Sequence, residues 1–426
     1  MPARLSAVSS ATALRAATLA GRRGPLLHER LAGAADQKKE GIEMSTQQDW
    51  DPRSPTVLDD QIAAYDAMRR RCPVAHSDYL HWSLFRHADV LRVLNDPGSF
   101  SSAVSARTSV PNGVDPPAHA AYRKIIDPYF APLQMRKFEP VCRGIAADLV
   151  SQLPAEGEIE LIADFADEFA LRIQCAFLGW PRDLRGPLRE WMRKSNAATL
   201  AGDRRALDAL GLEFDGHVRA QLELRRRAAD AAPDDLTTRL LQERIGERPL
   251  TDDELVSILR NWTVGEIGTI AACIGIVAQY LAAQPALQDR LAAETALLPA
   301  AIDEILRIHA PLIANRRITT RAVEFDGRRL EAGERITLIW ASANRDEAVF
   351  GDPDEFRLDR DPALNLLYGA GIHACPGAPL ARLELRVVFE VLLTARRIAA
   401  AAGKAPSRAI YPASGFSSLP LHLAWR

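Results

Sequence analysis

The stretch of sequence that decides the fold runs from Leu367 to Arg382 and reads LYGAGIHACPGAPLAR. A glycine-rich segment leads to a single cysteine, Cys375, and helical periodicity begins shortly after it. Gly369 and Gly377 permit tight turns and the close approach of a bulky ligand. These residues predict a thiol held on an extended loop at the start of a helix.

A cysteine in this position lies near the positive end of a helix, among unpaired backbone N–H groups, which favours the thiolate. One thiolate without a second cysteine or a cluster of histidines is a poor zinc site, because zinc takes four ligands. It suits a metal whose other ligands come from a macrocycle, and cysteine thiolate is a known axial ligand of haem iron. The alternative is a buried structural cysteine beside a turn.

The chain has 426 residues, of which 47% are apolar and 25% are charged, so we expect a packed core. A net charge of −2 argues against binding to nucleic acid. The five scattered cysteines do not suggest a disulfide framework and fit a reducing compartment, so we expect a cytoplasmic protein. The sequence contains no uninterrupted run of about eighteen apolar residues, and we predict no membrane span.

Residues 1–43 are rich in alanine and arginine, and no acidic residue precedes Glu29. This composition is compatible with a transit peptide. The alternative, which we favour, is a disordered tail or a wrongly assigned start, with Met44 as the true first residue. Residues 44–426 contain no internal repeat or long low-complexity linker, and we predict that they form one domain.

A capping box at Thr251–Glu254 opens a helical pattern that continues to about Ala283. This helix is long for a globular protein and carries few charges, so we expect it to be buried and to cross the centre of the domain. Gly265 and Gly268 each weaken a helix by ~1 kcal/mol relative to alanine. They predict either a local distortion or the close approach of a flat ligand.

Further motifs flank this helix on both sides. His119 and Arg123 follow an Asp-Pro-Pro segment and share one face of a predicted helix. Glu304 and Arg307 lie three residues apart on another predicted helix. The remaining motifs are two predicted strands (318–325 and 335–339) with a hairpin turn at 326–327, and the segments ANRD (343–346) and DPDEF (352–356).

Taken together, these motifs resemble those of the cytochrome P-450 family of haem-thiolate monooxygenases, in its soluble bacterial form. The family loop F-G-x-G-x-H-x-C-x-G is matched from Tyr368 to Gly377, with Tyr368 in place of phenylalanine. The resemblance covers roughly residues 58–426, with the motifs in the same order. It implies a mainly α fold with a small β region, in which a long central helix and the cysteine loop lie over and under a haem.

The resemblance also implies roles for individual residues around a haem b. Cys375 would be the axial ligand of the iron, with Gly369 and Gly377 in its loop. The residues expected to hold the haem propionates are His119, Arg123, His373 and Arg317, with Arg316 as the alternative to Arg317.

Other residues are expected to support the fold or to contact the substrate. Glu304 and Arg307 would form a buried structural pair, completed by either Arg360 or Arg345. The residues expected to face the substrate are Ile313, Ala314 and Gly265, and a turn at 416–419 is expected to line the same space.

The central helix of this family carries A-G-x-[DE]-T, whose acid and alcohol help to deliver protons. Thr269 falls on the alcohol position, whereas Gly268 falls on the acid position and departs from the pattern. Glu266 lies one turn before Thr269 on the same helix face. We hypothesise that Glu266 takes over the role of the acid or binds a polar group of the substrate. The alternative is that Glu266 pairs with an arginine as a structural bridge.

The implied reaction uses dioxygen, two electrons and two protons to form one oxygenated product and water. Because no strand is followed by a G-x-G-x-x-G dinucleotide signature, we expect a separate ferredoxin or flavodoxin-type donor and its reductase to supply the electrons. The expected substrate is a small organic molecule that the sequence does not name. The alternatives are a peroxide-driven peroxygenase, a non-catalytic haem sensor and, furthest from the observations, a haem-free protein.

Overall fold

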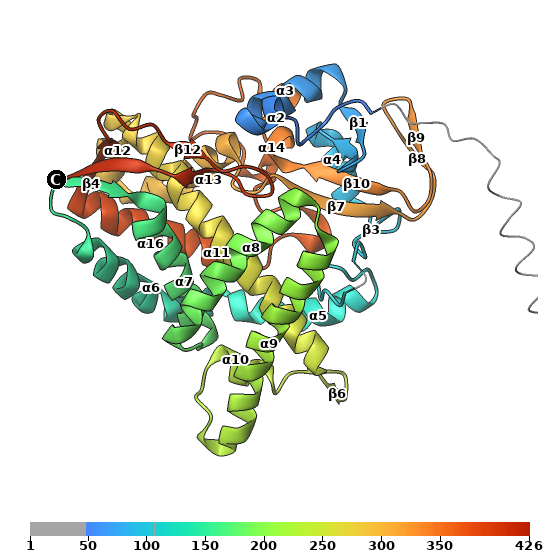
Figure 1. The fold of residues 1–426 in the computed structure, drawn as a ribbon, viewed down its shortest axis with the longest axis horizontal. Helices are drawn as coiled ribbons and strands as arrows, with labels where there is room; N and C mark the ends of the chain where they lie inside the picture. The colour runs from blue at the N-terminus through green and yellow to red at the C-terminus, as the bar shows by residue number, and fades with distance from the viewer. Residues whose placement is uncertain (1–47, 106) are drawn as a thin grey trace, which may run out of the picture. The chain divides into compact units, whose positions relative to one another are not determined.

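Helix α11 (Asp252–Ala282) runs through the middle of the protein, and the helices that pack most closely against it are α7, α9, α12, α13 and α16 (Figure 1). The computed structural model describes residues 48–105 and 107–426, so the predictions made for residues 1–43 lie outside the described residues. The described residues are mostly helical, with small sheets, which confirms the predicted fold class. The other helices are α2 (Pro55–Asp59), α3 (Gln61–Arg71), α4 (His87–Asn95), α5 (Ala118–Ile126), α6 (Pro132–Gln152), α7 (Asp167–Leu178), α8 (Arg185–Ala201), α9 (Arg204–Ala228), α10 (Leu236–Leu240), α12 (Pro285–Ala293), α13 (Leu298–His309), α14 (Trp340–Ala343), α15 (Glu347–Phe350) and α16 (Ala378–Ala395).

The start of α11 is the predicted capping box. The Glu254 N–H donates to Thr251 Oγ1, and the Thr251 N–H donates to the Glu254 carboxylate at 2.7 Å. Of the described helices, α11 alone is long and apolar enough to cross a membrane, but 67% of its most apolar window is buried inside the protein. The helix is α-helical without interruption, so the distortion predicted at Gly265 and Gly268 was wrong.

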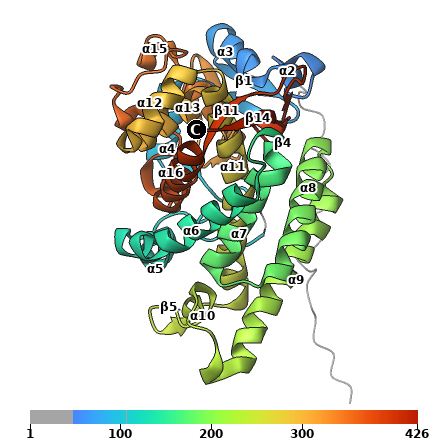
Figure 2. The ribbon, with the colours of Figure 1, turned by 90° about the vertical axis from the view of Figure 1, so that its left-hand side faces the viewer.

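The main apolar core lies where α6, α7, α11, α13 and α16 meet. Helix α16 packs along α6, and α11 packs against α7, α9 and α13. Figure 2 shows α8 and α9 side by side at the margin of the molecule, outside α7 and α11. The core is therefore built by helices from distant parts of the chain that meet around α11.

The largest sheet has five strands in the order β1-β2-β10-β7-β3, in which β2 and β10 are parallel and the other neighbours antiparallel. Its strands are β1 (Val74–Ser77), β2 (His81–Leu84), β3 (Phe100–Ser101), β7 (Ala314–Thr319) and β10 (Arg335–Ile339). A second sheet contains β4 (Gly157–Glu160), β11 (Arg396–Ala400) and β14 (Pro420–Trp425). Three hairpins complete the strands: β5 (Arg244–Ile245) with β6 (Arg248–Pro249), β8 (Val323–Phe325) with β9 (Arg328–Leu330), and β12 (Ser407–Arg408) with β13 (Phe416–Ser418).

The strand predicted over residues 318–325 was wrong as a single element. Its first residues belong to β7 in the large sheet, whereas its last residues form β8 in a separate hairpin. The break falls at Thr320, whose N–H donates to the Ser99 carbonyl oxygen instead of continuing the ladder to β10. The turn predicted at Asp326 and Gly327 is confirmed, because both residues have positive φ angles and join β8 to β9.

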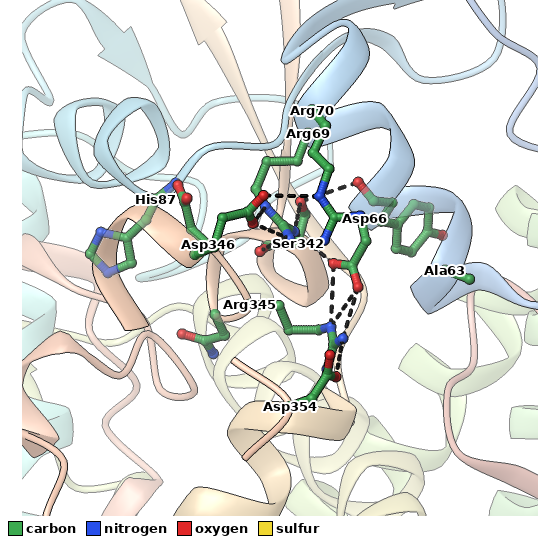
Figure 3. Close-up of polar contacts among 12 residues, drawn as sticks. Ala63, Asp66, Arg69, Arg70, His87, Ser342, Arg345, Asp346 and Asp354 are labelled. Atoms are coloured by element: carbon green, nitrogen blue, oxygen red, sulfur yellow. Dashed lines mark hydrogen bonds and ion pairs between the residues drawn. The ribbon is translucent and has the colours of Figure 1, made fainter. Parts of the chain in front are cut away.

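The ANRD segment anchors the sheet region to α3 through buried ion pairs (Figure 3). Arg345 donates to Asp66 at 2.8 Å and also pairs with Asp354. Arg69 donates to the same Asp66 at 2.7 Å and to the backbone oxygen of Ser342 at 3.0 Å. Asp66 thus compensates two buried guanidinium groups and fixes α14 against α3.

A loop between β3 and α5 is tied to α9 and α11 by one carboxylate. Asp215 of α9 accepts hydrogen bonds from Arg107 of the loop at 3.1 Å and from Arg260 of α11 at 2.6 Å. Arg260 also donates to the Thr108 carbonyl oxygen at 2.6 Å. Gly211 of α9 has no side chain in the space that the Arg107 guanidinium occupies. These contacts fix the loop to helices α9 and α11.

Candidate active site

The loop around Cys375 is fixed by a hydrogen bond within the loop and by a close contact with the end of helix α4. The Cys375 N–H donates to the Tyr368 carbonyl oxygen at 2.8 Å, and the loop then enters α16. Gly369 and Gly371 have φ angles of +72° and +66°, which favour glycine. A Cβ atom on Gly371 would collide with the backbone carbonyl oxygen of Leu94 at the end of α4.

Gly377 differs from the other two loop glycines. Its φ of −79° is open to any residue, and a Cβ atom there would lie 3.8 Å from Cys375 Sγ, an ordinary contact. The backbone conformation at residue 377 therefore does not depend on glycine, unlike that at residues 369 and 371. What Gly377 contributes is its N–H group, which together with that of Ala378 points to the cysteine sulfur.

The Cys375 side chain is exposed, although protein atoms surround it closely enough to matter electrostatically. Burial raises the pKa of the Cys375 thiol, and the N–H groups of Gly377 and Ala378 oppose this effect without reversing it. The predicted effect of the helix start is present, because the N–H groups of Gly377 and Ala378 lower the pKa, but desolvation outweighs it. A metal ion bound to a thiol deprotonates it outright.

Two imidazoles and one guanidinium converge beside this loop, and none of them forms an ion pair with an acidic residue in the part of the chain that the structure describes. The rings of His119 and His373 lie 4.3 Å apart, and both Nε2 atoms are buried without a hydrogen-bond partner among the described residues. Arg317 is also buried and donates only to the Arg316 carbonyl oxygen. Burial, followed by the charges of Arg317, His119 and Arg123, lowers the pKa of His373 to about 4. A site of this kind fits the carboxylates of a haem.

Arg123 has a different position from the other predicted propionate residues. Its guanidinium donates to the carbonyl oxygens of Ile372 at 3.2 Å and Ala374 at 2.7 Å, and to Asp127 at 2.6 Å. The side chain therefore clamps the cysteine loop to α5. Arg316, the alternative to Arg317, donates to the Tyr411 hydroxyl instead of joining the cluster.

The middle of α11 is exposed along one side, although most of the helix is buried. We call the residues of this side, Val264, Gly265 and Thr269, the open stripe. Val264 is 40% exposed, Gly265 is exposed, and Thr269 is half-buried. A Cβ atom on Gly265 would meet no other atom within 4 Å, whereas one on Gly268 would press on Met192 of α8. The other prediction for these glycines was the close approach of a flat ligand. There is open space for such a ligand at Gly265.

Glu266 points away from this stripe and into the core. Its residue is only 8% exposed, and its carboxyl interacts with Glu384 of α16. No arginine pairs with Glu266 within the described ranges, so the alternative of an arginine bridge was wrong. Glu384 was missed at the level of sequence, although helical spacing puts it on the same face as Leu380 and Val387.

Glu304 and Arg307 of α13 form the predicted buried pair. Arg307 donates to Glu304 through two nitrogen atoms at 2.7 and 2.9 Å, and to the carbonyl oxygens of Asn344 and Pro353. Arg360 completes the network by donating to Glu304 at 2.9 Å. The open choice between Arg360 and Arg345 is thereby decided in favour of Arg360.

A cavity of about 360 Å³ lies at the far end of α11. Ile313 and Phe416, both expected near the substrate, line it together with Ile276 and Tyr280. Ala314 and Gly265 are not among its lining residues. Ile313 therefore lines this cavity, whereas Gly265 lies on the open stripe of α11.

Comparison with known proteins shows which family and which relatives this chain is similar to. A family profile described as Cytochrome P450 matches residues 197–410. Cyclomarin C epoxidase CymV of Salinispora arenicola is 30% identical over 344 residues, covering 76% of this chain and 86% of that protein. Erythromycin C-12 hydroxylase of Saccharopolyspora erythraea is 31% identical over 352 residues, covering 78% and 87%.

Solved structures of the same kind superpose on the described fold. A mutant of P450 EryK in complex with erythromycin B has a TM-score of 0.77 and 28% identity, covering 85% of this chain and 97% of that one. CYP109E1 from Bacillus megaterium in complex with testosterone has a TM-score of 0.79 and 25% identity, covering 86% and 99%.

The single thiol on its loop, the buried group of His119, His373 and Arg317 beside it, and the long core helix together have the features of a haem-thiolate enzyme. With the sequence relatives, they show that the chain belongs to the cytochrome P450 family. It is a monooxygenase of that family, and membership implies a haem cofactor.

Proposed function

We propose that this enzyme binds haem b and inserts one oxygen atom into a small, largely apolar organic substrate. The observation that carries the proposal is the exposed Cys375 thiol, which lies close enough to α11 for the charge of Glu266 to raise its pKa. The stripe with Gly265 and Thr269 leaves open space on α11 for a flat cofactor.

Each group around this space has a proposed role toward the haem. Cys375 would hold the iron through its sulfur, and the N–H groups of Gly377 and Ala378 at the start of α16 would stabilise that sulfur. Arg317, His119 and His373 would hold the propionates, since both histidine Nε2 atoms are buried without a partner among the described residues and Arg317 donates to a carbonyl oxygen and to no carboxylate there. Arg123 positions the loop through its carbonyl oxygens. When bound, the haem supplies the iron that binds and activates dioxygen.

Thr269 and Glu266 are proposed to manage protons. They lie three residues apart on α11, with the Glu266 carboxyl directed into the core and Thr269 at the edge of the open stripe. Burial raises the pKa of Glu266 to about 7, which suits a group that gives and takes protons at neutral pH. Glu266 replaces the acid that Gly268 lacks, and Thr269 relays the proton from it.

The electron donor and the substrate are proposed from the sequence and the relatives. A ferredoxin or flavodoxin-type protein with its reductase supplies electrons in the cytoplasm, because the sequence carries no dinucleotide signature. Ile313, Ala314 and Gly265 are proposed to contact the substrate. Relatives named linalool 8-monooxygenase and vitamin D(3) 25-hydroxylase support an apolar molecule as substrate.

The test of this proposal is the variant Cys375→Ser with Cys72→Ser as its control. The holoenzyme reduced under carbon monoxide is expected to show a red-shifted thiolate-type Soret band. Cys375→Ser is expected to lose the band, because a hydroxyl does not replace the thiolate, whereas Cys72→Ser is expected to keep it. An unchanged spectrum in Cys375→Ser would refute the assigned ligand.

A second assay separates the proposed monooxygenase from a peroxygenase. Linalool and testosterone are incubated with a surrogate ferredoxin, its reductase and NADPH, or with hydrogen peroxide alone. Product in the first mixture supports the proposal. Product with peroxide alone, and none with the electron donors, would show the peroxide-driven alternative.

A further inference from the structure

Gly268, which stands where the family pattern has an acidic residue, faces helix α8. A Cβ atom on Gly268 would lie 2.9 Å from the Met192 Cε atom of α8, closer than Cβ contacts in proteins come. Apart from the adjacent backbone of α11, no other heavy atom of the described residues lies within 4 Å of that position. Met192 therefore takes the space that any side chain at residue 268 would need.

This contact lies at the edge of the open stripe. Gly268 follows Val264 by four residues and Gly265 by three, so the three residues are neighbours on one side of α11. The space at Gly265 is open, whereas Gly268 is half-buried under Met192. Met192 is itself half-buried, so part of its side chain borders accessible space. The methyl group of Met192 thus bounds the open stripe on the side of α8.

The backbone of α8 is anchored close to Met192. The Trp191 indole N–H donates to the Leu210 carbonyl oxygen of α9 at 2.7 Å. Arg189 pairs with Glu168 of α7 at 2.8 Å. Since these contacts hold the helix to both of its neighbours, the flexible thioether side chain of Met192 is the part that can move.

Methionine suits such a position, because its side chain is unbranched and has three rotatable bonds. A ligand that lies flat on the open stripe would leave the methyl group over Gly268 undisturbed. A ligand with bulk on the side of α8 would have to displace that methyl group and break its contact with α11. Bulky groups are therefore disfavoured in this space relative to flat ones.

We infer that Met192 is a specificity-determining residue, which selects flat apolar ligand groups beside Gly265 against branched ones. Glycine at residue 268 is what allows the methionine to occupy this position. The inference rests on the proposed function, because it requires the haem and the substrate to occupy the space beside the open stripe. The steric pairing of Met192 with Gly268 does not depend on the haem.

The first test asks whether the two residues are coupled, in a double-mutant cycle of Met192→Ala, Gly268→Ala and the double variant. The measurement is the midpoint of chemical denaturation of the holoenzyme. Alanine is the better helix residue, so Gly268→Ala is expected to raise the midpoint in the Met192→Ala background. In the wild-type background the new methyl group must displace Met192, and the midpoint is expected to rise less or to fall.

Gly144→Ala in α6 is the matched control, because a Cβ atom there would meet nothing within 4 Å. It is expected to shift the midpoint equally in both backgrounds. An equal shift for Gly268→Ala in both backgrounds would overturn the pairing. If Gly268→Ala folds only together with Met192→Ala, the pairing is supported. If it folds in neither background, another neighbour limits residue 268 and the inference fails.

The second test measures shape selection through the absorbance change of the oxidised holoenzyme during titration with two probes. These are phenylimidazole and tert-butylimidazole, substituted at the same ring carbon, so that one carries a flat group and the other a branched group. Met192→Ala is expected to improve the affinity for the branched probe several-fold relative to the flat one, and Met192→Phe is expected to worsen it. Arg193→Ala, whose side chain is 73% exposed on the same helix, is the control and is expected to leave the ratio unchanged.

The two tests separate this inference from the proposed function. A ratio of dissociation constants that is the same in Met192→Ala, Met192→Phe and the wild type would overturn the inference and leave the haem site intact. The absence of any absorbance change with either probe in the wild type would refute the proposed haem site, and with it the shape selection. The denaturation cycle would then still decide the pairing of Met192 with Gly268.

Discussion

At the scale of single residues, the site depends on groups whose ordinary chemistry is changed by burial. The Cys375 thiol, the His373 imidazole and the Glu266 carboxyl are all shifted toward their neutral forms. Desolvation is the largest cause in each case. In the proposed holoenzyme, an iron cation beside Cys375 and two propionates beside His373 would change the charge balance of these groups.

Thr269 gives a residue-scale prediction with a control on the same helix. Thr269→Val is expected to raise the hydrogen peroxide released per dioxygen consumed several-fold, because the hydroxyl that relays the proton is lost. Thr263 is the matched control, since its hydroxyl bonds to the Leu259 carbonyl oxygen and to Gln174 inside the core. Thr263→Val is expected to lower stability by ~1–3 kcal/mol without changing that ratio. Equal ratios in both variants would contradict the relay.

Local motifs could be predicted from sequence, whereas contacts between distant residues could not. The Cys375 loop carries its own pattern of glycines, and its conformation follows largely from that pattern. The use of Arg123 as a clamp on the loop depends on how α5 packs against it. The partner of Glu266 lies on a helix far away in sequence, so only the fold reveals Glu384.

At the scale of elements, the network of Glu304, Arg307 and Arg360 joins α13 to the segment before the cysteine loop. Arg307 and Glu304 have side chains that are only 1% and 6% exposed. Glu304→Ala is expected to destabilise the protein by about 3–5 kcal/mol, because it leaves a buried guanidinium uncompensated. Chemical denaturation checks this value. Asp359→Ala, in an exposed pair with Arg357, is the control and is expected to leave the midpoint unchanged.

The contacts of Asp215 predict how the loop before α5 is held. Asp215→Asn is expected to weaken the bonds from Arg107 and Arg260 and to speed amide exchange in residues 107–113 about tenfold, equivalent to ~1.5 kcal/mol. Hydrogen exchange followed by mass spectrometry measures the change. Asp208→Asn, an exposed neighbour on the same helix, is the control. Unchanged exchange in Asp215→Asn would show that the apolar contacts of the loop hold it without the carboxylate.

Helices were predicted more reliably than strands, for a physical reason. The capping box and apolar content of α11 are local properties that remain the same in any fold. Residues 318–325 alternate like one strand, but Thr320 leaves the ladder because Ser99 offers a carbonyl oxygen. Strand pairing is decided by partners elsewhere in the chain.

At the scale of the whole molecule, a buried histidine links stability to pH. Burial, with the charge of Arg345, lowers the pKa of His309 to about 4, against 6.5 ordinarily. The unfolded chain therefore binds a proton in this window that the native protein does not, so His309 contributes stability above pH 6.5 that is lost as pH falls toward 4. His309→Gln is expected to flatten this dependence in denaturation curves. At pH 8, where His309 is neutral in both states, the difference in the free energy of unfolding between the two proteins measures the packing cost of the substitution. An equal dependence of that free energy on pH in both proteins would contradict the prediction.

The contact between Gly371 and the end of α4 also constrains the order of events in the cell. The loop that carries Cys375 is shaped against Leu94, a residue made long before it on the ribosome. The end of α4 is therefore synthesised early, but the loop that packs against it is synthesised only when most of the chain has been made. If Cys375 holds the iron as proposed, the cofactor would be bound only after almost the whole chain has been made, and a chain that ends before Cys375 would lack the ligand.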